Sequence, residues 1–110
     1  MKQLRRLNEC VLQKSIKEKQ DNGTYKDSYI DIDEYKITLQ ELTDQVSANI
    51  YGANINKIYR ITSPYHKLEN YLLTKLTNNN DNISKYFVYL KSNRYKVISL
   101  KTKWIDIELL

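Results

Sequence analysis

The feature that most constrains the fold of this chain is the Asn22-Gly23 pair, which lies between two alternating segments. Asn and Gly tolerate the positive φ angles of a type I′ turn, and this turn commonly joins antiparallel strands. Residues 10–17 and 30–33 alternate between apolar and polar side chains, as half-buried strands do. The pattern predicts a hairpin centred on Gly23. A helix stays an alternative for the start of the chain, because residues 4–11 also fit a 3.6-residue period.

The middle of the chain predicts one short helix between two strands. Residues 35–42 continue the alternation of the hairpin, and residues 55–62 read as a further strand. Between them, Thr43 is a suitable helix N-cap and Gly52 can supply a left-handed C-terminal stop. Two turns of helix fit in this interval, with Val46 and Ile50 on its apolar face.

A second helix is predicted from Ser63-Pro64, where serine can cap and proline can occupy the first helical position. Its apolar face is formed by residues spaced about one turn apart: Tyr65, Leu68, Leu72 and Leu76. The chain's clearest loop follows. It consists of residues that bond their own backbone and resist regular structure: Asn78, Asn79, Asn80, Asp81 and Asn82.

The last part of the chain predicts a three-stranded meander. Strands are expected at 86–90, 95–100 and 105–109, and Lys91-Ser92-Asn93 turns the chain between the first two. The total is about six strands and one or two short helices in one domain, residues 1–110. Strands so closely spaced in so short a chain favour a mainly β fold, a small closed antiparallel barrel, because closure removes exposed edges.

Charge is distributed unevenly along the sequence. The net charge is +5 overall, and it is +4 over residues 1–20, −5 over 21–45 and +6 over 46–110. Lys, Asn, Ile and Tyr all have AT-rich codons, so part of the basic excess reflects the genome. If each segment lies on its own side of the molecule, copies can pack head to tail, acidic edge against basic edge. The alternative is that the segments interleave in space and cancel.

Few residues have the properties of a catalytic or metal site. His66 is the one side chain that titrates near neutrality, and Glu69 could face it on a helix. Cys10 has no partner for an internal disulfide and is expected to be buried as a small hydrophobe. Asp31 and Asp33 alternate with apolar residues, which is typical of the solvent face of a strand. We therefore expect no enzyme, no cofactor and no metal site, and neither a signal peptide nor a membrane span.

The ten tyrosines allow three interpretations. They can replace Phe in the core, they can enlarge a protein interface, or they can stack on the bases of single-stranded nucleic acid beside basic residues. The last interpretation makes a small nucleic-acid-binding barrel the alternative function. Its candidate surface comprises Lys85-Tyr86, Lys91, Arg94-Tyr95-Lys96 and Lys57-Tyr59-Arg60.

Four short motifs occur in an order that matches a known family. They are Arg5-Arg6-Leu7-Asn8-Glu9-Cys10-Val11, Asp21-Asn22-Gly23-Thr24-Tyr25, Ile58-Tyr59-Arg60-Ile61 and Arg94-Tyr95-Lys96-Val97-Ile98. In this order the chain resembles the small head–tail adaptor, or head-closure ("stopper"), proteins of long-tailed bacteriophages. The family often has Trp where this chain has Tyr29, and the 63–82 segment is longer here.

The resemblance implies a β-barrel subunit of a homo-oligomeric ring, commonly of twelve copies, in the virion neck. Such a ring docks on the portal-side adaptor ring after packaging, closes the head, retains the double-stranded DNA in its channel and offers a surface to the tail terminator protein. It would be assembled in the host cytoplasm. The candidate interface residues are Asp31, Asp33, Glu34, Lys57 and Arg60. Either the loop Asn78–Asn82 or the hairpin tip 21–24 would face the channel or the next ring.

Overall fold

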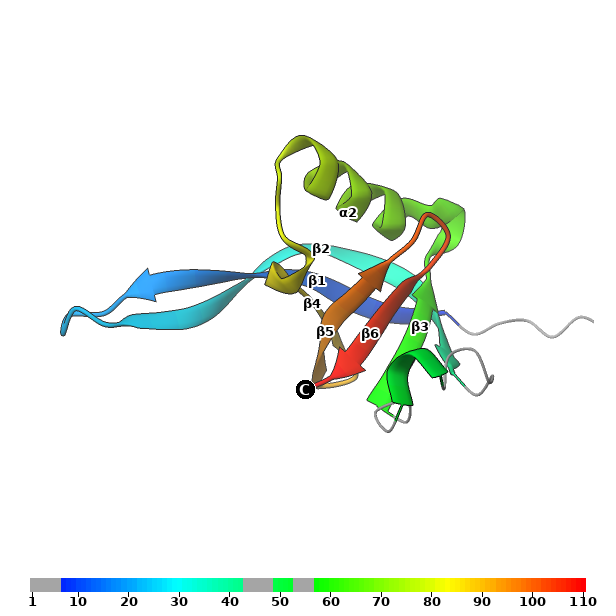
Figure 1. The fold of residues 1–110 in the computed structure, drawn as a ribbon, viewed down its shortest axis with the longest axis horizontal. Helices are drawn as coiled ribbons and strands as arrows, with labels where there is room; N and C mark the ends of the chain where they lie inside the picture. Colours follow the sequence, from blue (N-terminus) through cyan, green and yellow to red (C-terminus); the bar gives the residue numbers. More distant parts are fainter. Residues whose placement is uncertain (1–6, 43–48, 53–56) are drawn as a thin grey trace, which may run out of the picture.

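The computed structural model describes residues 7–42, 49–52 and 57–110, and it is mainly β. Six antiparallel strands form a closed barrel in the order β1-β2-β3-β6-β5-β4 (Figure 1), which confirms the predicted fold class. The elements are β1 (Asn8–Lys19), β2 (Tyr25–Glu41), β3 (Ile58–Thr62), η2 (Pro64–His66), α2 (Lys67–Asn78), η3 (Ile83–Lys85), β4 (Tyr86–Leu90), β5 (Asn93–Leu100) and β6 (Ile105–Leu109).

The barrel closes where the first strand meets the fourth. β1 pairs with β4 over residues 11–14, and β2 pairs with β3 over residues 38–41. The start of the described chain is therefore a strand, and the helical alternative is wrong from residue 8 onward. The β4-β5-β6 meander is confirmed, with β5 beginning two residues earlier than expected.

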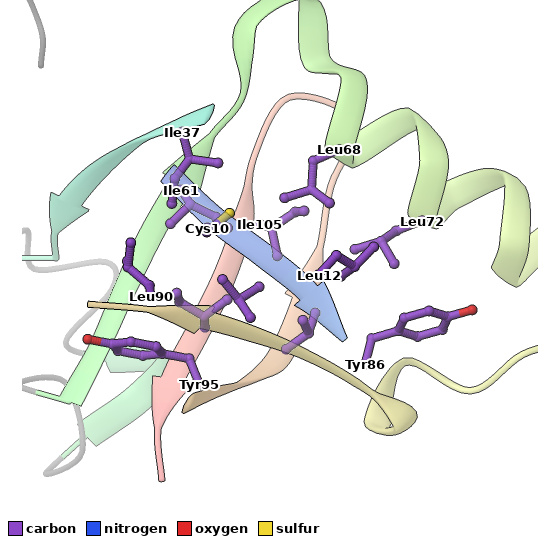
Figure 2. Close-up of a cluster of buried hydrophobic side chains, with 13 residues drawn as sticks. Cys10, Leu12, Ile37, Ile61, Leu68, Leu72, Tyr86, Leu90, Tyr95 and Ile105 are labelled. Atoms are coloured by element: carbon purple, nitrogen blue, oxygen red, sulfur yellow. The ribbon is translucent and has the colours of Figure 1, made fainter. Parts of the chain in front are cut away.

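The core fills the barrel interior and continues under the helix. Leu68 and Leu72 of α2 are buried, and Figure 2 shows them pointing from the helix toward Leu12 and Ile105 of the barrel. Since a fully buried leucine contributes about 1.5–3 kcal/mol, these two side chains hold α2 over one end of the barrel. The buried cluster comprises Cys10, Leu12, Ile37, Ile61, Leu68, Leu72, Tyr86, Val88, Leu90, Tyr95, Val97, Ile105 and Ile107.

The predicted helix start is wrong by several residues. Pro64 opens a single 3-10 turn, and the α-helix begins only at Lys67. Tyr65 and His66 between them both have positive φ, which breaks the helical path. Tyr65 therefore leaves the predicted apolar face and is 88% exposed.

The first predicted helix lies mostly outside the described residues, as do Thr43, Val46 and Ile55. Residues 49–51 are helical, and Gly52 follows them with φ +61°. This conformation is the left-handed one expected of a helix stop.

The β1–β2 hairpin is confirmed, but its turn differs from the expected one. β1 ends at Lys19 and β2 begins at Tyr25, and Gly23 in the turn between them has φ +85°. Asn22 does not share the positive φ; its side-chain carbonyl instead accepts from the Thr24 N–H at 3.1 Å. A local Asn hydrogen bond thus replaces the type I′ geometry. The two consecutive positive φ angles of a type I′ turn occur instead at Lys91 and Ser92, between β4 and β5.

Cys10 supports a prediction about pH. Its side chain is buried, and burial raises the pKa of the thiol from 9.0 to about 12, against the lowering effect of a backbone hydrogen bond from Tyr35. The unfolded thiol ionises first, so the free energy of unfolding should fall as pH rises through 9, and this fall should be less steep in Cys10→Ala than in the wild type. Urea titrations of both proteins at a series of pH values measure the free energy of unfolding. Rapid labelling of native protein by a thiol reagent near neutral pH would contradict the burial.

Candidate functional site

The hairpin projects from the barrel as a two-stranded ribbon, here called the arm and defined as residues 15–29. In Figure 1 the arm extends far to the left of the barrel, and the molecule measures 59 × 31 × 29 Å. Cross-strand pairing runs from Ser15↔Tyr29 to Lys19↔Tyr25. No residue of the arm is buried. The arm thus adds surface to the molecule and contributes nothing to its core.

Both long edges of the arm lack a strand partner within the described part of the chain. β4 pairs with β1 only as far as Lys14, which leaves the outer edge of β1 open over residues 15–19. β3 pairs with β2 only from Thr38 onward, which leaves the outer edge of β2 open over residues 25–37. Open strand edges present unpaired N–H and C=O groups and are templates for another strand.

The base of the arm is fixed to the barrel by aromatic and polar contacts. The Arg94 guanidinium lies 3.7 Å from the centroid of the Tyr29 ring, and Tyr29 packs edge-on against Phe87. Gln13 accepts a hydrogen bond from Arg94 and donates one to Asp31. Cation–π and hydrogen-bond contacts of this kind set a direction for the ribbon. The arm therefore leaves the barrel along a defined path.

The predicted acidic residues lie on β2 at and beyond the base of the arm. Asp31 and Asp33 are exposed, as the alternating pattern predicted, and Glu34 is exposed as well. Asp31 accepts from Gln13 at 2.8 Å, and Asp33 accepts from the backbone N–H of Glu34. These interactions leave the negative charges at the surface. Lys57 is exposed as well.

Arg60, in contrast, has an acidic partner inside its own barrel. It donates from Nε and Nη2 to Asp106, a residue opposite it on β6 that is 2% exposed. Tyr51 donates a hydrogen bond to the same carboxylate, and the guanidinium stacks on Trp104 at 4.7 Å. Burial, followed by the hydrogen bond to Asp106, raises the pKa of Tyr51 to about 12. The cluster joins β3, β6 and residue 51, which gives Arg60 a structural role.

The asparagine-rich loop is tied to the barrel at Asp81. Its carboxylate accepts from the Tyr86 hydroxyl at 2.6 Å and from Lys14 Nζ at 3.2 Å. These two contacts, Tyr86 first, lower the pKa of Asp81. Asn78 belongs to α2, and Asn82 caps the following 3-10 turn at Ser84. Among the predicted gate residues, Asn79 and Asn80 lie between these anchors.

Ser63, His66 and Glu69 come together at the start of α2. Glu69 is fully buried; it accepts from the Ser63 hydroxyl and from His66 Nδ1, each at 2.7 Å. The predicted facing of His66 and Glu69 is confirmed. In a nucleophilic triad the histidine must lie between the hydroxyl and the carboxylate. Here the carboxylate lies between the other two, so the arrangement is not that of a nucleophilic triad.

The structure also places the tyrosines of the predicted stacking surface. Tyr86 and Tyr95 are buried, and Tyr59 packs edge-on against Tyr95 with ring centroids 5.9 Å apart. These three rings belong to the core or its margin. Tyr25, Tyr65 and Tyr89 are the exposed rings among the described residues.

Sequence reasoning found the acidic residues and the His66–Glu69 pair but missed the open edges of the arm. The described residues include no cluster of three or more His, Cys, Asp or Glu that could hold a metal ion. None of the helices in the described ranges is long and apolar enough to cross a membrane. No protein-family model matches the chain, and no curated protein matches it.

Proposed function

We propose that the protein is a structural subunit of a bacteriophage neck, where a ring of identical copies closes the DNA-filled head after packaging and joins it to the tail. The order of motifs along the chain supports this assignment, since it resembles that of head-closure proteins. The closed six-stranded barrel agrees with the subunit that the resemblance implies.

The observation that carries the proposal is the projecting arm with its two open edges. A two-stranded hairpin is only marginally stable in water on its own. The arm has none of its residues in the core and leaves strand edges unpaired over residues 15–19 and 25–37. Contact with other protein subunits would bury this surface and pair these edges. Assembly is therefore the role that best accounts for the arm.

Of the two candidate elements, the tip of the arm can reach the channel or the next ring more readily than the asparagine-rich loop can. The tip, residues 21–24, is exposed and lies farthest from the barrel (Figure 1). The asparagine-rich loop is held back by the bonds of Asp81 to Tyr86 and Lys14. We assign the tip to contacts with packaged DNA, the portal-side adaptor ring or the tail terminator protein.

Removing the acidic charges of β2 tests whether assembly is electrostatic. The triple variant Asp31→Asn, Asp33→Asn, Glu34→Gln should weaken ring formation about tenfold at physiological salt, because exposed charges facing an oppositely charged neighbour contribute to association. Sedimentation velocity measures the shift. Glu41→Gln is the control, since it removes an exposed carboxylate of the same strand at a position where β2 is already paired with β3. Normal rings from the triple variant would refute charge pairing at this strand.

A further inference from the structure

The two open strand edges of the hairpin, residues 15–19 of β1 and residues 25–37 of β2, differ in charge. β1 contributes Lys17, Glu18 and Lys19 beside its open edge, a net positive segment. β2 contributes Asp31, Asp33 and Glu34 beside its own open edge, and its residues 25–36 carry a net negative charge. Charged residues on a strand edge discourage indiscriminate pairing. A positively charged edge and a negatively charged edge still attract each other.

This difference selects one mode of pairing between copies. Joining two β1 edges would bring lysines together, and joining two β2 edges would bring carboxylates together. Like charges opposite each other on neighbouring strands are destabilising. Pairing β1 of one copy with β2 of the next avoids both conflicts. This contact uses two different surfaces, so it is heterologous, the type of contact that generates a ring when its rotation closes.

A groove is present at the part of β2 that carries these acidic residues. It has a volume of about 400 Å³ and is lined by residues 33–36 on the strand and by residues 63–65 and 67 at the start of α2. If neighbouring arms point the same way, β1 of one copy runs antiparallel to β2 of the next, because the two strands are antiparallel within each arm. The geometry of the ladder is then the same within and between copies.

We propose that the open β1 edge of one copy, residues 15–19, pairs with the β2 edge of an identical neighbour near residues 31–34. Lysines 17 and 19 of one copy then lie against the aspartates of the next, and the arms form a continuous antiparallel β-belt. This inference rests on the proposed ring and adds the contact that holds it together. The occupant of each open edge is a second copy of the same chain.

A charge swap tests the contact. Within one chain Lys17 is opposite Asp27, whereas Asp31 is opposite Gln13, so the lysines and Asp31 are not cross-strand partners. In a background that carries Asp27→Asn, so that no like charge faces residue 17 within the chain, we expect Lys17→Glu with Lys19→Glu to weaken assembly about tenfold, and Asp31→Lys with Asp33→Lys to do the same. All four changes in one chain should restore assembly. Rings that are lost in both double variants and not restored in the quadruple variant would overturn the pairing.

Shortening the arm provides a second measurement. Deleting residues 18, 19, 25 and 26 removes two opposed pairs and keeps the turn and the alternation of the ribbon. The thermal midpoint of the monomer should stay unchanged, because no core residue is removed, while ring formation should be lost. Rings formed by the shortened protein would refute the belt and leave the neck function standing. A wild-type chain that never forms rings, even with its neck partners, would refute the proposed function itself.

Discussion

Asp106→Ala is expected to lower the free energy of unfolding by about 3 kcal/mol. Asp106 is buried on β6 and holds Arg60 of β3 through two hydrogen bonds, with Tyr51 as a third donor. Its removal takes away the acceptor of two Arg60 hydrogen bonds and of the Tyr51 hydroxyl. The Arg60 side chain is 26% exposed, so water can replace part of the lost interaction. This places the expected effect at the lower end of the range for broken buried pairs.

Thermal and urea unfolding measure the effect, and a loss of this size corresponds to a fall in Tm of roughly 10–20 °C for a domain of this length. Glu108→Ala is the matched control. It removes a carboxylate from the same strand at a position only half-buried, and its cost should stay within about 0.5 kcal/mol. If the two variants proved equally stable, the Arg60–Asp106 pair would not hold β3 to β6.

Glu69→Ala should destabilise the protein by about 3 kcal/mol. The fully buried carboxylate accepts from the Ser63 backbone N–H, the Ser63 hydroxyl and His66 Nδ1. Ser63 in turn accepts from the Leu68 N–H at 3.0 Å, which stabilises the first turn of α2. Without Glu69 the donors of Ser63 lie buried without a partner, and the positive-φ turn at residues 65–66 loses its anchor.

Urea titrations of three variants separate this role from a general loss of packing. Glu69→Gln keeps the shape and one acceptor oxygen, so its cost should be intermediate. His66→Ala removes a single hydrogen bond from a residue that is partly exposed, and should cost about 1 kcal/mol. A Glu69→Ala protein as stable as His66→Ala would show that Ser63 does not depend on the carboxylate.

The strands were predictable because alternation with period two is strong in this sequence. It located the hairpin, the meander and the exposed face that carries Asp31 and Asp33. Alternation gives no sign that Asp106, which lies between Ile105 and Ile107, is buried. Arg60 binds its carboxylate, and the pairing of β3 with β6 across 46 residues of sequence leaves no local signal.

The arm was not predictable for a related reason. Alternation indicates that residues 10–17 and 30–33 are extended, but it does not indicate where a neighbouring strand ceases to pair with them. Pairing with β4 stops at Lys14 of β1, and pairing with β3 begins at Thr38 of β2. These two positions decide which part of the hairpin leaves the barrel. The two positive-φ residues Tyr65 and His66 were missed similarly, because tyrosine rarely adopts that conformation and histidine, although enriched there, mostly adopts others.

The most direct test is the size and shape of the wild-type particle at physiological salt, alone and with its portal-side and tail-side neck proteins, by sedimentation velocity and electron microscopy. We expect a closed ring of identical subunits whose arms lie side by side. A protein that stayed monomeric with both neck proteins present, its arm free in solution, would contradict the account.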